Sequence, residues 1–236
     1  MKHSLVFTVA ILAAISTAVP QEIYRMPEGD DPTHLTPPSV EHSGELEYMV
    51  LLQEKLLSRW GRGQCGTMLA MPAFTGEYCV SIYEETKGGE DAAAAKDESK
   101  EYIATSAKAS GNLFFGLESK KRGEPVREIE ITHTERKISP ELAVAFQRVW
   151  ARAILQTRYP QAEPPQTSDG ISYRFSVLVE IGDISGEAHN PEKGIGKEMA
   201  EIGHKLYDYV SGEETMGKKE EDELIARLRD LEKKLP

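Results

Sequence analysis

Apolar residues recur at intervals of three and four in several parts of the chain, as they do along one face of a helix. The clearest case is residues 140–154, where Leu142, Phe146 and Trp150 share one face. Ser139 is placed to cap this helix and Pro140 to occupy its first position. The same spacing predicts helices over residues 43–60, 194–210 and 218–235.

Other segments alternate between apolar and polar residues, which indicates strands. Residues 173–181 alternate without a break, and Leu178 on the reverse side favours a central strand with both faces covered. Shorter alternating segments predict strands at residues 77–84, 102–107, 112–118 and 126–134. Because their connections are short, we expect antiparallel pairing.

The order of these elements predicts an α+β fold: a largely antiparallel sheet of about five strands, packed with two to three helices, plus a charged C-terminal helix. Residues 41–211 form a single domain in this interpretation, and residues 212–236 form the tail helix. The leucine seam at 224–235 is short for a coiled coil, so packing back onto the domain is favoured over association.

Two segments lack the apolar content of a folded core. Residues 19–40 contain five prolines and predict a linker or an extended arm. Residues 85–100 are rich in glycine, alanine and charge, which indicates an exposed, mobile insert.

The first 18 residues have the order of a secretory signal: Lys2, an apolar run, then Ser16 and Ala18 at the positions that a signal peptidase reads. The apolar run is about 11 residues long, whereas a bilayer span needs about 20. A retained anchor or a buried N-terminal helix explains this order less well. We therefore expect cleavage near Ala18, a periplasmic or secreted location, and no stable membrane insertion after cleavage.

The charge balance bears on partners. The chain carries 28 basic and 39 acidic residues, a formal net charge of −11. Nucleic-acid binding needs a basic surface that releases counterions, so a nucleic-acid partner is not expected. An anionic membrane surface is disfavoured for the same reason.

Cys65 and Cys79 are the only cysteines. In an exported protein they predict a disulfide that ties the loop before the first strand to that strand. The alternative is two unpaired thiols. A catalytic cysteine needs a nearby histidine, and none is identifiable by position in the sequence.

Two short motifs raise the question of a cofactor or metal. Residues 61–66 match G-x-G-x-x-G, but a helix precedes them and no helix obviously follows, so a dinucleotide site is not predicted. Glu201, His204 and Asp208 lie along one helical strip, which a carboxylate-histidine metal site would need in two copies. A solvated polar face is favoured, and we expect no cofactor and no metal.

Arg148, Arg152 and Arg158 form a basic strip in an acidic chain. The strip could contact a carboxylate or an acidic partner surface. Pairing with the protein's own glutamates is the favoured alternative.

A loose pattern of residues runs through the second half of the chain over about 70 residues and ends with the predicted helix near Leu206. Its members are Val149, Trp150, Arg158, Tyr159, Pro160, Asp169, Gly170, Tyr173, Phe175, Ser176, Asn190 and Pro191. In this pattern the chain resembles uncharacterised small exported proteins of Gram-negative bacteria. The resemblance implies an exported location and no known activity.

No catalytic residue is predicted, because the chain has no G-x-S-x-G, H-E-x-x-H, P-loop or C-x-x-C motif. The leading hypothesis is a non-enzymatic periplasmic binding or interaction protein, with an envelope protein or a small ligand as partner. The alternative is a periplasmic hydrolase with an unrecognised active site.

Overall fold

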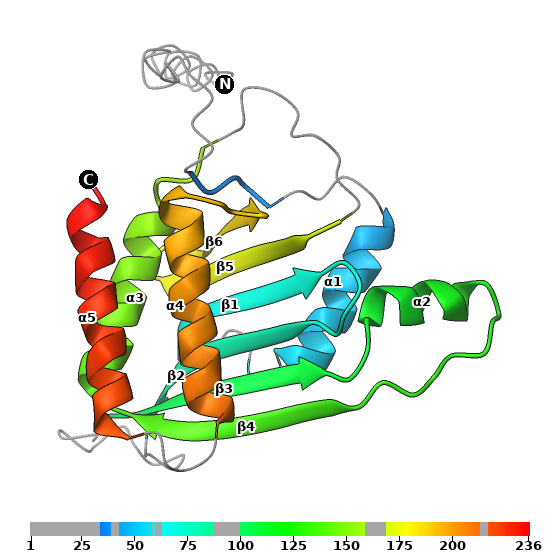
Figure 1. Ribbon diagram of the computed structural model, residues 1–236, viewed down its shortest axis with the longest axis horizontal. Helices are drawn as coiled ribbons and strands as arrows, with labels where there is room; N and C mark the ends of the chain where they lie inside the picture. The colour runs from blue at the N-terminus through cyan, green and yellow to red at the C-terminus, as the bar shows by residue number, and fades with distance from the viewer. Residues whose placement is uncertain are drawn as a thin grey trace, which may run out of the picture. The chain divides into compact units, whose positions relative to one another are not determined.

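Six antiparallel strands form one sheet in the order β4-β3-β2-β1-β5-β6 (Figure 1). The first four follow one another as a meander, and β5 then pairs with the free side of β1. The strands are β1 (Gln64–Pro72), β2 (Tyr78–Thr86), β3 (Lys100–Ala109), β4 (Ile131–Ile138), β5 (Ile171–Val179) and β6 (Gly182–His189).

The computed structural model describes residues 34–38, 43–57, 59, 63–86, 100–158, 169–212 and 217–236. The predicted signal peptide at 1–18, most of the arm at 19–40 and most of the insert at 85–100 lie outside these residues. Two residues of the predicted arm belong to the folded unit: Leu35 is buried in the core, and Thr36 pairs with Glu187 at the edge of β6.

Three helices cover one face of the sheet, which we call the inner face (Figure 1). The helices α3 and α4 pack on the strands, and α5 packs across α3 and α4 as a further layer. The opposite, outer face carries α1, and α2 follows β3 beyond the end of the sheet. Their bounds are α1 (Ser43–Leu56), α2 (Leu113–Lys121), α3 (Pro140–Ile154), α4 (Gly194–Ser211) and α5 (Lys218–Lys234).

Aromatic side chains fill the centre of the inner core. Phe146 and Trp150 of α3 stack at 3.8 Å, and the indole Nε1 donates to the carbonyl of Thr67 at 3.0 Å. The Phe146 ring lies directly against Gly66, whose φ of +156° and missing Cβ allow the close approach. This contact fixes α3 on β1.

A row of hydroxyl side chains crosses the outer face of the sheet. Thr105, Ser81, Thr67, Ser176 and Ser185 are successive register partners on five neighbouring strands. The hydroxyls of Thr67 and Ser81 are 2.8 Å apart and fully buried. Because a one-residue slip would turn every side chain to the other face, this row specifies the register.

The predicted α+β class is confirmed, with six strands in place of about five. The helices α3, α4 and α5 occupy the predicted segments, and Ser139 caps α3 by accepting from the Leu142 N–H at 3.2 Å. The tail helix packs back on the domain through Leu224, Leu228 and Leu231.

Some local predictions are wrong. The alternation over residues 112–118 predicts a strand, but Leu113–Lys121 is helix α2, capped by Asn112. The strand β4 lies further along the chain than the predicted 126–134. The strands β1 and β6 were missed because β1 is buried on both faces and β6 contains glycine and few large apolar residues.

The predicted disulfide between Cys65 and Cys79 is also wrong, since both thiols are free and buried. Cys65 packs in the inner core and Cys79 in the outer one. The register partner of Cys79 is Leu69, and the four residues from Cys65 to Leu69 span about 13 Å of strand. A disulfide needs Cα atoms within about 7 Å.

Burial raises the pKa of Cys65 to about 11 and that of Cys79 to about 12. Both residues therefore remain thiols at neutral pH, and neither supplies a nucleophilic thiolate.

None of the described helices is both long and apolar enough to span a bilayer.

Replacement of Leu228 by alanine tests the docking of α5. Leu228 is 0% exposed, whereas Leu155 at the end of α3 is 66% exposed. We expect Leu228→Ala to lower the free energy of unfolding by about 2–5 kcal/mol in urea titrations, and Leu155→Ala by less than about 0.5 kcal/mol. Equal effects of the two substitutions would show that α5 does not pack on the core.

Candidate functional site

The outer face contains an open groove of about 580 Å³, bordered by α1, α2 and the ends of β1, β5 and β6. We call it the aromatic groove. Helix α1 covers β1, β2 and β3 through Leu52 and Leu56, and the groove opens where this cover ends. Its lining residues are Tyr48, Met49, Met71, Pro72, Ala73, Phe74, Asn112, Phe114, Phe115, Ser172, Arg174 and Glu187.

Phenylalanine rings dominate the groove and are unusually open to solvent. Phe74 is 68% exposed and Phe115 is 48% exposed. The rings of Tyr48 and Phe114 meet edge to face with centroids 5.4 Å apart. Clustered exposed aromatic side chains are typical of a binding surface, whereas isolated ones are not.

Most of the exposed apolar residues lie on the elements that border this groove or on the segments next to them, and Phe74, Phe114 and Phe115 line it. Of the nine large apolar side chains that are exposed among the described residues, six lie on α1, on α2, or on the segments next to β1 and α2. Leu46 lies three residues before Met49 on α1, so the apolar surface continues from the groove along that helix. The six are Leu46, Val50, Phe74, Phe114, Phe115 and Val126.

A buried carboxylate holds the two helical walls together. Glu77 is 0% exposed, and its carboxylate accepts from the hydroxyl of Tyr48 on α1 at 2.6 Å. It also accepts from the N–H groups of Leu113 at 2.8 Å and Phe114 at 3.3 Å, in the first turn of α2. Burial, followed by the charge of Glu77, raises the pKa of Tyr48.

Asn112 secures the loop that carries Phe74. Its side-chain amide donates to the carbonyls of Pro72, Ala73 and Thr75 at 3.2–3.3 Å. The oxygen of the same amide accepts from the N–H of Phe115 at 2.9 Å. The loop and α2 are therefore joined, and the groove is preformed on this side.

The polar end of the groove consists of an ion pair and a serine–histidine contact. Arg174 and Glu187 form an ion pair across β5 and β6, and their side chains are only 16% and 18% exposed. Ser172 lies beside them, with its Oγ 2.8 Å from Nδ1 of His189.

The distance between Ser172 and His189 is that of a nucleophile and its general base, but in this hydrogen bond the histidine is the donor. Asn190 accepts from the Ile171 N–H through Oδ1 and donates to the Asp169 carbonyl through Nδ2, which fixes its amide orientation. The same Nδ2 lies 3.1 Å from Nε2 of His189, so Nε2 must accept. His189 then carries its proton on Nδ1, donates to Ser172, and cannot accept the serine proton.

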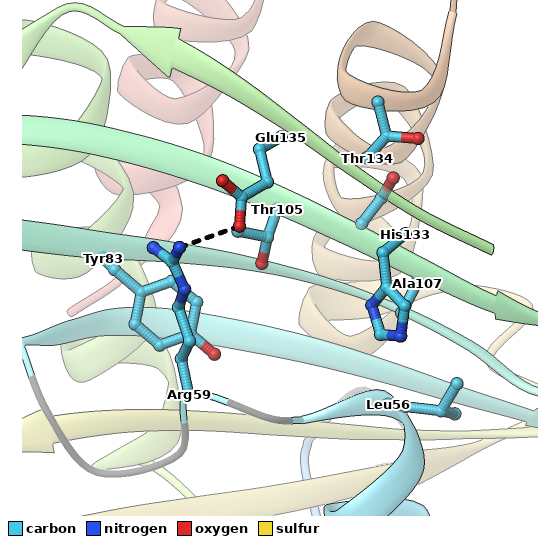
Figure 2. A pocket seen from close by; sticks show the side chains of 9 residues that line it. Leu56, Arg59, Tyr83, Thr105, Ala107, His133, Thr134 and Glu135 are labelled. Atoms are coloured by element: carbon cyan, nitrogen blue, oxygen red, sulfur yellow. Dashed lines mark ion pairs between the residues drawn. The ribbon is translucent and has the colours of Figure 1, made fainter. Parts of the chain in front are cut away.

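A second hollow, between α1 and the strands β2, β3 and β4, is polar and small (Figure 2). Arg59 enters it and pairs with Glu135 at 2.9 Å and with Glu85 at 2.6 Å. Its volume of about 20 Å³ is room for a single water molecule. It is not a ligand site.

The strip of Glu201, His204 and Asp208 does not form a metal centre. The ring nitrogens of His204 bond the hydroxyls of Tyr78 at 3.1 Å and Tyr173 at 2.9 Å, which leaves neither for a metal. Among the described residues, no three histidine, cysteine, aspartate or glutamate side chains gather as ligands. Burial lowers the pKa of His204, so the neutral ring is favoured.

The predicted basic strip divides in two. Arg148 and Arg152 both bind Glu232 of α5, at 2.7 and 3.3 Å, as expected for pairing with the protein's own glutamates. Arg152 also donates to the carbonyls of Leu235 and Pro236. Arg158 stands apart from them and is exposed. The glycine motif at 61–66 leads into a strand, so it has no context for a dinucleotide.

The sequence prediction missed the aromatic groove. Phe114 and Phe115 lie in a segment whose alternation predicts a strand, and the Tyr48 helix, the Phe74 loop and β6 are far apart in the sequence. The one local signal for a binding surface is the pair of adjacent phenylalanines followed by Gly116. Adjacent residues of a strand point to opposite faces, so a strand here would need both faces covered.

Comparison of the chain with protein-family models, with curated proteins and with solved structures finds no match in any of the three.

The lowered pKa of His204 predicts acid sensitivity. Its ordinary pKa is 6.5, and burial depresses it in the folded state, so the unfolded chain binds the proton first as the pH falls. The neutral His204 ring therefore makes its full contribution to the free energy of unfolding above about pH 6.5. This contribution is lost as the pH falls through the pKa of His204 in the folded state. We expect His204→Gln to lose less thermal stability than the wild type between about pH 7.5 and about pH 5.5. Parallel melting curves of the two proteins across this range would contradict the prediction.

Proposed function

We propose that this protein is an exported, non-enzymatic binding protein whose ligand is a small, largely apolar molecule that occupies the aromatic groove. The observation that carries the proposal is the groove itself: about 580 Å³, lined by aromatic and methionine side chains, with a few polar groups at one end. Ligand pockets in proteins share this size and this composition.

The construction of the groove supports binding of a ligand over simple exposure of apolar surface. Glu77 and Asn112 fix the walls by hydrogen bonds, so little conformational freedom remains to be lost on binding. Met49 and Met71 supply flexible, polarizable side chains that adapt to the shape of a ligand.

The polar groups at the groove favour binding over hydrolysis. A hydrolase needs a base that accepts the proton of its nucleophile. In the pair that lies closest to this role, His189 donates to Ser172. The hydrogen bond between His189 and Ser172 therefore joins β5 and β6 at the edge of the groove.

The exported location rests on the N-terminal sequence. Lys2, the apolar run and Ala18 support a cleaved signal, and the resemblance of the second half of the chain implies the same location.

Binding of the uncharged fluorescent probe N-phenyl-1-naphthylamine tests the proposal. We expect saturable binding at one site, with enhanced fluorescence. Phe115→Asp places a charge among the groove rings and should weaken binding by about tenfold or more. Leu155→Asp makes the same kind of change at an exposed position directly after α3, away from the groove, and serves as the matched control.

Weakening by Phe115→Asp alone supports the groove as the site. Absence of saturable binding, or equal weakening by the two substitutions, would overturn the proposal. Circular dichroism of both variants establishes that each is folded.

A further inference from the structure

The charges around the aromatic groove do not balance. Of the described residues that line it, only Arg174 and Glu187 carry a formal charge, and these two neutralise each other through their ion pair. Glu77 lies in the wall behind Tyr48 and Phe114 and contributes a further charge. The groove and its wall therefore carry a net negative charge.

The side-chain oxygens of Glu77 are surrounded by hydrogen-bond donors. They accept from the Tyr48 hydroxyl and from the N–H groups of Leu113 and Phe114. This set of partners suits a carboxylate, which only accepts hydrogen bonds. Because the group is fully buried, water does not screen its charge.

This charge acts on the aromatic wall. The Tyr48 hydroxyl donates to the carboxylate at 2.6 Å, which pushes electron density into the phenol ring and makes the face of the ring more negative. The Phe114 ring packs edge to face against Tyr48, and Phe115 packs against Phe114 at 5.8 Å. Faces of such rings attract cations.

The donor groups that could attract an anion to the groove already bind carboxylate or amide oxygens of this chain. The first N–H groups of α2 point to Glu77 and Asn112, so this helix start offers no vacant anion site. Arg174 donates to Glu187 through Nε and also contacts it through Nη2. The chain as a whole carries a charge of −11, which repels anions at longer range.

We propose that the aromatic groove selects an apolar ligand that carries a positive charge, an organic ammonium compound. The inference rests on the proposed function and names the chemical class of its ligand. The ammonium group lies against the rings of Tyr48, Phe114 and Phe115, and the hydrocarbon body lies along Met49, Met71 and Phe74.

A series of ligands with one chain and different head groups tests this inference without altering the protein. Decyltrimethylammonium, decyl alcohol and decanoate, each below its micelle concentration, are titrated against the full chain with bound N-phenyl-1-naphthylamine. We expect the ammonium compound to displace the probe with a Kd about tenfold below that of decanoate, and several-fold below that of the alcohol.

Three variants locate the source of the preference. Glu77→Gln removes the buried charge and keeps the shape of the side chain. Phe115→Leu removes a ring and keeps an apolar side chain at an exposed position, so it does not depend on refolding of the wall. In both variants the Kd of decanoate should exceed the Kd of decyltrimethylammonium by about threefold or less. Glu141→Gln removes one charge from α3, where Glu141 pairs with Arg229, and should keep the wild-type ratio.

The outcomes separate the two proposals. If the neutral probe binds but decanoate binds as tightly as the ammonium compound, the preference for cations is overturned and the groove remains a binding site. A ratio reduced equally by Glu141→Gln would also overturn it, because the net charge of the chain would then be its source. If neither the probe nor any decyl ligand binds, the proposed function itself fails.

Discussion

The buried carboxylate of Glu77 is the constraint on which the outer side of this protein depends. An ionised group without solvent contact is tolerated only where donors surround it. Here the donors come from Tyr48 of α1 and from the first turn of α2, while Glu77 itself precedes β2. The positions of both helices relative to the sheet are therefore linked through one side chain. Loss of that side chain would leave the Tyr48 hydroxyl and the N–H groups of α2 without a partner.

The two faces of the sheet are covered unequally, and this inequality creates the candidate site. On the inner face, α3 and α4 pack on the strands, α5 closes the layer, and Trp150 and Phe175 are fully buried. On the outer face, α1 covers three strands and leaves the ends of β1, β5 and β6 open. Stability comes mainly from the inner core, so the outer face can keep aromatic rings exposed for binding.

The sequence pattern predicts a helix or strand correctly where the residues that define the element lie within the same segment. The helix α3 has its cap at Ser139 and its apolar stripe in one continuous segment, so the prediction is correct. In α2, Leu113, Phe115 and Leu117 alternate like a strand. The start of the helix is fixed by Asn112, which caps it, and by Glu77, which accepts from its first N–H groups and lies 36 residues before Leu113. The register that separates Cys65 from Cys79 is likewise absent from their spacing, and so the disulfide prediction is wrong.

The sequence alone determined the α+β class, the antiparallel pairing of the sheet, the three helices of the inner face and the negative charge of the chain. These follow from composition and from periodicities of two and about 3.6 residues, which each segment carries within itself. Only the tertiary structure decided that Phe74, Phe115 and Met71 border one groove, that Glu77 lies behind its wall, and that His189 donates to Ser172. Such relations join residues far apart in the chain, and packing and hydrogen-bond satisfaction in the whole fold determine them.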